Sequence, residues 1–196
     1  MPYYQEITLI EQEEIAIYFI WSKLYAQLHL ALAEVKNHND KTNIGVSFPE
    51  YRFNEEKGIG FLGSKLRLFA NSEDELHNLN INSWLVRLSD YLHITSIREV
   101  PPHKITGYAI FSRKQVKTNA DRLARHRIKR GDINFDEAVK RYQNVITTSD
   151  LPFVQLKSLT NQHPFRLFIH KENKEHAEIG GFSSYGLTTD ATVPEF

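Results

Sequence analysis

Residues 12–36, QEEIAIYFIWSKLYAQLHLALAEVK, decide the fold because they predict one long amphipathic helix near the start of the chain. The polar run at 36–40 ends this helix. Its apolar positions recur at helical spacing and form one face, which is expected to lie against the core. These positions are Ile17, Ile20, Trp21, Leu24, Leu28, Ala31, Leu32 and Val35.

The segments around this helix predict a sheet. A Ser-x-x-Glu capping box at 72–75 opens a second helical region, which reaches about Leu92 with a break expected near 80–82. Segments rich in β-branched, aromatic and other apolar residues predict four strands, at 3–10, 44–48, 65–70 and 93–100. The order β-α-β-β-α-β is typical of the ferredoxin-like arrangement, an α+β fold with a four-stranded antiparallel sheet and two helices on one face.

The pair Pro101-Pro102 interrupts this pattern and is the predicted domain boundary. Residues 1–100 are then a ferredoxin-like domain. Residues 101–196 are a smaller α+β domain with strands expected at 105–111, 153–156, 165–169 and 181–187 and a helix at 135–143.

Residues 112–130, SRKQVKTNADRLARHRIKR, concentrate positive charge. They hold eight of the chain's 24 Lys and Arg residues against the single acid Asp121, so they carry formal +7 while the rest of the chain carries −7. Such a concentration is expected of an element that binds a polyanion, and we infer a nucleic acid.

The same stretch predicts a basic helix at about 120–130. Thr118 or Asn119 is a suitable cap, and Gly131 is a suitable stop. The alternative is a solvated surface helix, but such helices usually mix charges of both signs. One face of the predicted helix carries Arg122, Arg125, His126, Lys129 and Arg130.

Composition excludes several classes of protein. The chain has no cysteine, which removes disulfides, thiolate metal sites and cysteine nucleophiles. The longest apolar stretch, Ile15 to Trp21, is shorter than a membrane span and follows acidic residues, so neither a membrane segment nor a secretory signal is expected. A cytoplasmic location fits best.

Two further patterns predict no chemistry. Residues 57–62, KGIGFL, resemble an RNA-recognition signature, but Ile59 stands where an aromatic is needed, so a glycine-rich connecting loop is favoured. Nine histidines include no His-Glu-x-x-His pattern, and the acids form no obvious two-metal cluster. We therefore expect no catalytic metal and no cofactor.

Several separated motifs run through the chain in order, namely NIGVSFP at 43–49, DLPFVQLKS at 150–158, FRLFI at 165–169, GGFSSYGL at 180–187 and the closing VPEF at 193–196. The first helix also carries a histidine, and the pattern Arg113-x-Gln115 precedes the basic helix. Together these features resemble the type I-F CRISPR repeat endoribonuclease family over nearly the whole chain.

The resemblance implies roles for individual residues. His29, Ser158 and Tyr185 match the family's catalytic set, although helix context alone favours a structural role for His29. Arg113 and Gln115 match readers of base edges at the foot of an RNA hairpin. The basic helix matches the one that enters the hairpin's major groove, and the implied RNA-binding residues are Arg113, Gln115, Lys117, Asn119, Arg122, Arg125, His126, Lys129, Arg130 and Phe165.

The basic helix departs from the family pattern. Where the family carries arginines in near-continuous file, this chain has Ala124, His126 and Lys129. Lysine lacks the bidentate fork of arginine, so individual phosphate contacts are expected to differ while the charge of the face is similar.

The resemblance implies a metal-independent endoribonuclease that cuts CRISPR precursor RNA at the 3′ base of the repeat hairpin. The expected ends are a 2′,3′-cyclic phosphate and a 5′-hydroxyl, and the guide RNA stays bound, with other subunits of a surveillance complex as partners. A non-catalytic RNA-hairpin-binding subunit and a DNA-binding regulator are the alternatives. If the fold brings His29, Ser158 and Tyr185 together beside Phe165, the enzyme is favoured; if they are scattered, the binding subunit is favoured.

Overall fold

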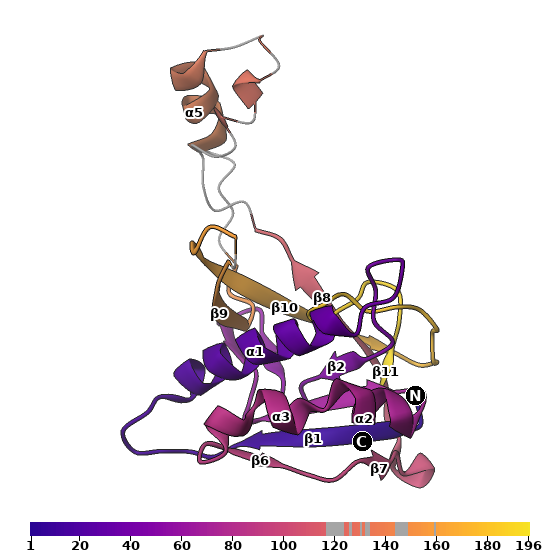
Figure 1. The fold of residues 1–196 in the computed structure, drawn as a ribbon. Coiled ribbons are helices and arrows are strands. Elements are labelled where there is room, and N and C mark those ends of the chain that lie inside the picture. The colour runs from indigo at the N-terminus through magenta and orange to yellow at the C-terminus, as the bar shows by residue number, and fades with distance from the viewer. Residues whose placement is uncertain (117–123, 126, 130, 132–133, 144–148, 159) are drawn as a thin grey trace. The chain divides into compact units, whose positions relative to one another are not determined.

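The computed structural model describes residues 1–196 except 117–123, 126, 130, 132–133, 144–148 and 159. The described chain forms two compact units (Figure 1). One unit comprises Met1–Arg113 with Leu151–Phe196, and the other comprises Lys114–Asp150.

The first sheet has the strand order β2-β5-β1-β6, with β7 also paired to β1 and every pairing antiparallel. Its strands are β1 (Tyr3–Leu9), β2 (Gly45–Ser47), β5 (Lys65–Ala70), β6 (Leu92–Ile94) and β7 (Arg98–Glu99). This is the strand order of a split β-α-β unit, so the predicted ferredoxin-like arrangement is confirmed.

Three helices follow the strands as the pattern predicts. These are α1 (Ile17–Glu34), α2 (Glu73–Leu79) and α3 (Ile81–Trp84), and a short 3-10 helix follows at Val86–Leu88. Since α1 contacts α3 while α2 contacts β1 and β5, the helices cover one face of the sheet (Figure 1). The predicted break is confirmed at Asn80, whose φ of 44° ends α2.

Several element boundaries differ from the prediction, and two of the differences lie in the first sheet and its helix. The helix α1 begins at Ile17 instead of residue 12, after an extended Ala16 that makes no side-chain cap. The predicted strand 93–100 is two short strands, β6 and β7, that pair with opposite ends of β1.

The glycine-rich loop predicted at 57–62 is wrong. The strands β3 (Arg52–Asn54) and β4 (Ile59–Phe61) pair antiparallel as a hairpin. Gly58 supplies a φ of 60° in the connecting turn, and the Asn54 side chain accepts a hydrogen bond from the Lys57 amide at 2.9 Å. The conformation of Gly58 and the hydrogen bond between Lys57 and Asn54 close the hairpin locally. The hairpin therefore forms although its strands lack a strong alternation of apolar and polar residues.

The second sheet has the strand order β11-β8-β10-β9. Its strands are β8 (Gly107–Lys114), β9 (Phe153–Lys157), β10 (Pro164–Lys174) and β11 (Val193–Glu195). A further short 3-10 helix, Pro102–Lys104, precedes β8. The strand predicted at 181–187 is wrong, because Gly186 has a φ of 69° and closes a turn there.

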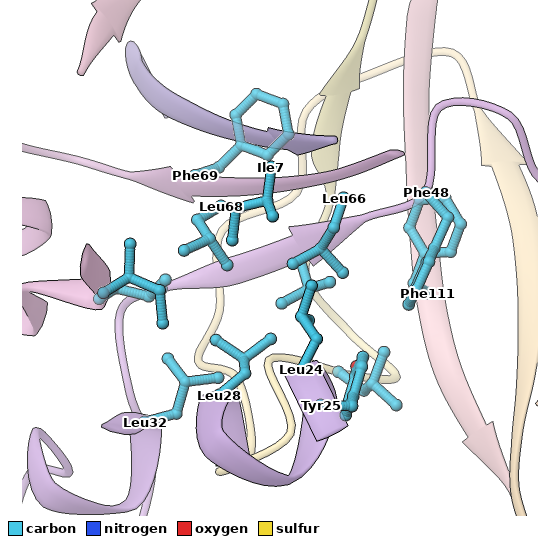
Figure 2. Packing of buried hydrophobic residues seen from close by; sticks show 14 of the residues in the cluster. Ile7, Leu24, Tyr25, Leu28, Leu32, Phe48, Leu66, Leu68, Phe69 and Phe111 are labelled. Carbon is cyan, nitrogen blue, oxygen red and sulfur yellow. The ribbon is translucent and has the colours of Figure 1, made fainter. Parts of the chain in front are cut away.

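One hydrophobic core joins both sheets through α1, which packs against β9 as well as against the first sheet. Figure 2 shows Phe111 of β8 beside Phe48, within the cluster that contains Leu24 and Leu28 of α1. The buried set includes residues well beyond the proline pair, namely Leu167, Ile169, Phe182 and Val193. The compact units therefore follow boundaries other than residue 100.

The Lys114–Asp150 unit contains α5 (Phe135–Gln143), as predicted, with the Asn134 side chain accepting a hydrogen bond from the Glu137 amide at 2.9 Å. Residues 124–125 and 127–128 are helical. Gly131 has a φ of 79° and its amide donates to the Ile128 carbonyl at 2.9 Å, as expected of the predicted stop. In the described parts of the chain, no helix is long and apolar enough to cross a membrane.

Candidate active site

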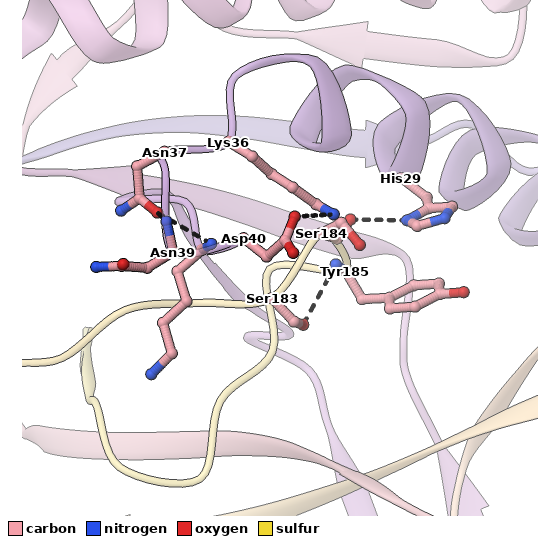
Figure 3. A network of polar contacts seen from close by, with 9 residues as sticks. His29, Lys36, Asn37, Asn39, Asp40, Ser183, Ser184 and Tyr185 are labelled. Carbon is pink, nitrogen blue, oxygen red and sulfur yellow. Dashed lines mark hydrogen bonds and ion pairs between the residues drawn. The ribbon is translucent and has the colours of Figure 1, made fainter.

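His29 lies on α1 at the edge of the buried face, next to the fully buried Leu28. Its Nδ1 atom is 2.9 Å from the carbonyl oxygen of Ser184 (Figure 3). A carbonyl only accepts hydrogen bonds, so Nδ1 carries the hydrogen. In the neutral imidazole the lone pair therefore lies on Nε2, and the ring is prepared to take a proton there.

The phenol ring of Tyr185 is stacked on the imidazole of His29. The ring centroids are 4.1 Å apart and the planes differ by 2°. The backbone of Tyr185 is held as well, because the hydroxyl of Tyr25 donates to its carbonyl at 2.8 Å. Burial, with a smaller contribution from Tyr185, raises the pKa of Tyr25, so this hydroxyl stays protonated and remains a donor.

A tight turn at residues 183–187 places the Ser184 carbonyl and the Tyr185 ring against α1. The Gly186 amide donates to the Ser183 carbonyl at 2.8 Å, and the Ser183 amide donates to the Leu187 carbonyl at 2.9 Å. Gly186 has a φ of 69°, and a Cβ atom there would lie 2.2 Å from Cγ2 of Val46. Both the backbone angle and the close approach to β2 therefore require glycine.

The segment carrying the turn is fastened to both sheets. Phe182 exchanges backbone hydrogen bonds of 2.8 and 2.9 Å with Thr42, next to β2. The Thr188 amide donates to the Phe111 carbonyl of β8 at 2.9 Å. The position of Tyr185 is thus fixed by elements far apart in the sequence.

Arg113 connects the His29–Tyr185 pair to Phe165. Its guanidinium carbon is 5.6 Å from the Tyr185 ring centroid and 5.5 Å from that of Phe165, and its side chain is exposed. A cation at this distance is attracted by an aromatic face. We call His29, Tyr185, Arg113 and Phe165 the His29 cluster.

The backbone register of β9 and β10 places Ser158 near Phe165. Phe165 on β10 pairs with Leu156 on β9, and Ser158 follows two residues later, where its amide donates to the His163 carbonyl at 2.9 Å. The Ser22 hydroxyl donates to the Gln155 carbonyl, which holds β9 against α1. Ser158 thus directly follows the last residue of β9, and this end of β9 lies beside the start of β10, where Phe165 is found.

The remaining predicted RNA-binding residues belong to the Lys114–Asp150 unit. Gln115, Arg125 and Lys129 are exposed there. The others lie outside the described residues, and these are Lys117, Asn119, Arg122, His126 and Arg130. Among the described residues, no group of three or more His, Asp or Glu side chains is arranged to hold a metal ion.

Sequence reasoning missed two residues that shape this site, Tyr25 and Gly186. Tyr25 precedes His29 by four residues, and this spacing places both side chains on one side of the helix. The spacing was a usable signal. No sequence signal identifies Gly186, because the contact that requires glycine at this position is with Val46 of a distant strand.

Comparison with known sequences places the chain among the CRISPR-associated proteins. It belongs to the family described as CRISPR-associated protein (Cas_Csy4), whose model matches residues 4–196. Two relatives are both called CRISPR-associated endonuclease Cas6/Csy4. The one from Escherichia coli (strain UTI89 / UPEC) is 34% identical over 198 residues. The one from Pseudomonas aeruginosa (strain UCBPP-PA14) is 38% identical over 198 residues.

Both relatives are covered completely, at 100% of each chain. A solved structure described as an RAMP protein binding different RNA substrates matches 98% of this chain and 100% of that chain, with a TM-score of 0.36 and 12% identity. The family membership rests on the sequence relatives and the family model, since the similarity to that structure is slight.

Proposed function

We propose that this protein is a metal-independent endoribonuclease that cleaves CRISPR precursor RNA at the 3′ base of the repeat hairpin and then keeps the guide RNA. The observation that carries the proposal is the His29–Tyr185 stack, in which the Ser184 carbonyl fixes the imidazole. The names of two full-length relatives, both called endonucleases, support it.

The reaction needs no external nucleophile because RNA carries its own 2′-hydroxyl. The 2′-oxygen attacks the adjacent phosphorus while the bond from phosphorus to the 5′-oxygen breaks. The 2′-hydroxyl loses a proton and the departing 5′-oxygen gains one. The products are therefore a 2′,3′-cyclic phosphate and a 5′-hydroxyl.

His29 performs one of the two proton transfers at Nε2, the nitrogen that faces away from Ser184. An imidazole suits this task because its ordinary pKa of about 6.5 is close to neutral pH. Tyr185 orients the ring by stacking on it. Ser158 holds the ribose 2′-hydroxyl, a role that its place beyond the partner of Phe165 supports.

Substrate recognition is assigned to Arg113, Gln115, Phe165 and the basic helix. Arg113 and Gln115 read base edges at the foot of the hairpin, and Phe165 stacks beside the cleaved bond. The basic helix grips the stem from its major groove. The major groove of A-form RNA is narrow, so long arginine side chains at the end of a helix suit this contact better than short ones.

The mechanism is tested by incubating a repeat hairpin with the protein in EDTA. We expect cleavage by the wild-type protein, none by His29→Ala, and none with a 2′-deoxy substitution at the cleavage position, while binding persists in all cases. Dependence on added metal would contradict metal independence. Unchanged cleavage by His29→Ala would contradict the mechanism.

The proposed setting is a type I-F surveillance complex in the cytoplasm. There the protein remains on the hairpin of its product while other subunits bind the rest of the guide RNA. Retention is measured as co-elution of protein and cleaved hairpin on size exclusion at physiological salt, because protein–RNA affinity depends strongly on salt.

A further inference from the structure

Tyr25 is a buried tyrosine beside the candidate site, and the proposed mechanism gives it no role. Its side chain is 0% exposed, and its ring lies parallel to Phe48 at 6.2 Å and 7°. A buried phenol usually needs a partner for its hydroxyl. Here that partner is the Tyr185 carbonyl, 2.8 Å away.

Tyr25 and His29 bind consecutive carbonyls of the same turn. They stand four residues apart on α1, so both project from the same side of the helix toward residues 183–187. His29 donates to the Ser184 carbonyl at 2.9 Å, and Tyr25 donates to the carbonyl of the next residue. The two bonds hold two consecutive carbonyls of the turn against α1.

This arrangement gives Tyr25 a route to the tautomer of His29 through the backbone of the turn. The Ser184 carbonyl selects the Nδ1–H form only while it points at the imidazole. Tyr25 orients the next peptide group, Tyr185–Gly186, which turns as one planar piece. Only the φ and ψ angles of Tyr185 separate it from the Ser184–Tyr185 group that faces His29. If the hydroxyl is removed, the turn loses its only donor from the helix besides His29 itself among the described contacts.

We infer that Tyr25 is a positioning residue for the imidazole of His29, acting through the backbone of Ser184 and Tyr185. This inference rests on the proposed function where it concerns cleavage. The part of the inference that concerns the tautomer of His29 is independent of the proposed function, because the tautomer is a property of the protein without RNA.

Tyr25→Phe is the direct test, and Tyr51→Phe is its matched control. The Tyr51 hydroxyl also donates to a backbone carbonyl, that of Ile169 at 3.0 Å, and its ring lies 6.1 Å from Phe111 in the same core. Each variant removes one oxygen and one hydrogen bond while keeping the ring. Only Tyr25→Phe removes a bond to the turn that carries Tyr185.

Two measurements separate positioning from a general loss of stability. The first is the set of ¹⁵N chemical shifts of the neutral His29 ring, recorded without RNA, which report which nitrogen carries the hydrogen. We expect the Nδ1–H form in the wild-type protein and in Tyr51→Phe, and a mixture of tautomers in Tyr25→Phe.

The second measurement is the single-turnover cleavage rate of a repeat hairpin together with its dissociation constant. Loss of one neutral hydrogen bond predicts a rate about two- to tenfold lower in Tyr25→Phe, with the dissociation constant unchanged. Tyr51→Phe should cleave at the wild-type rate.

The outcomes separate the two hypotheses. Wild-type tautomer and wild-type rate in Tyr25→Phe would overturn the positioning role, and so would an equal loss of rate in Tyr51→Phe. If the wild-type protein does not cleave the hairpin, the proposed function fails, and the ring nitrogen shifts still decide whether Tyr25 positions His29.

Discussion

The imidazole of His29 and the phenol ring of Tyr185 lie parallel, with a 2° angle between their planes and 4.1 Å between their centroids. The two residues come from opposite ends of the chain. The stack covers one face of the imidazole and the Ser184 carbonyl occupies Nδ1, so Nε2 is the ring atom left for chemistry. In the proposed mechanism, the relationship therefore determines which edge of His29 meets the RNA.

Replacing Tyr185 separates stacking from chemistry of the phenol. Tyr185→Phe keeps an aromatic face against His29, so we expect single-turnover cleavage within about threefold of wild type. Tyr185→Leu removes the stack, and the misplaced imidazole should lower the rate by about 10- to 100-fold. If Tyr185→Phe lost as much rate as Tyr185→Leu, the hydroxyl would take part directly.

Gly186→Ala should displace the turn that carries Tyr185. The left-handed conformation costs an L-residue about 1–2 kcal/mol. The added Cβ, 2.2 Å from Cγ2 of Val46, adds an overpacking cost of about 1–3 kcal/mol. Thermal unfolding should show a clearly lower melting temperature, together with slower cleavage.

Gly131→Ala is the control for that substitution. Gly131 has a φ of 79°, and a Cβ there would meet no atom within 4 Å. The loss of stability in Gly131→Ala should therefore come only from the left-handed backbone conformation, without an overpacking cost. Equal destabilisation by both substitutions, measured in urea, would show that contact with Val46 contributes nothing.

The sequence predicted those features that depend on neighbouring residues. The capping box at 72–75 is present, with the Ser72 hydroxyl accepting from the Glu75 amide at 3.3 Å, and α5 spans the predicted 135–143. The apolar and aromatic residues at 181–187 resembled a strand, but Gly186 closes a turn against Val46. Periodicity cannot reveal a contact between segments so far apart.

The candidate site shows the same division. Helical periodicity places His29 at the border of a buried face, where a structural histidine is the commoner outcome. Its partners, Ser184 and Tyr185, lie more than 150 residues away and are brought near by packing of both sheets on α1. Only the resemblance to a family linked these positions in advance, and their catalytic roles remain a prediction.

Arg113→Lys should weaken recognition at the foot of the hairpin without removing charge. The planar guanidinium lies over both Phe165 and Tyr185, and lysine reproduces neither the stacking nor the bidentate fork. We expect the substitution to reduce the preference for the native base pair at the foot, measured by competition between native and altered hairpins. A preference identical to wild type would exclude Arg113 as a base reader.

Glu50→Gln should change the acid stability of the protein. The Ser64 amide and hydroxyl donate to Oε2 of Glu50 at 2.7 and 2.9 Å, and chiefly the amide bond lowers the pKa of this carboxyl. Because the folded-state pKa is lowered, the charged carboxylate stabilises the protein at pH values above the ordinary pKa of about 4.3. This stabilisation is lost as the pH falls through the folded-state pKa.

The melting temperatures of wild type and Glu50→Gln should therefore differ most near neutral pH and converge as pH falls below about 4. Differential scanning calorimetry between about pH 3 and 7 measures this directly. A difference that stays constant over that range would mean that the charge of Glu50 contributes nothing.

Residues 1–100 alone should not fold cooperatively, although a proline pair follows them. Their core includes Phe48, which contacts Phe111 at 5.4 Å between ring centroids, and Gly45, which packs against Phe182 and Val193. Losing one buried phenylalanine costs about 3–5 kcal/mol, whereas a whole domain is stable by about 5–15 kcal/mol. Removing the entire set should therefore exceed the stability available.

We expect the 1–100 fragment to bind a hydrophobic dye and to lack a sharp thermal transition, whereas the full chain melts cooperatively. Such a result would mean that the second sheet completes the core on which α1 and His29 depend. A cooperative transition of the fragment near the full-length melting temperature would instead support an independent domain ending at residue 100. In that case the strands from residue 107 onward would position Tyr185 without stabilising the fold that carries His29.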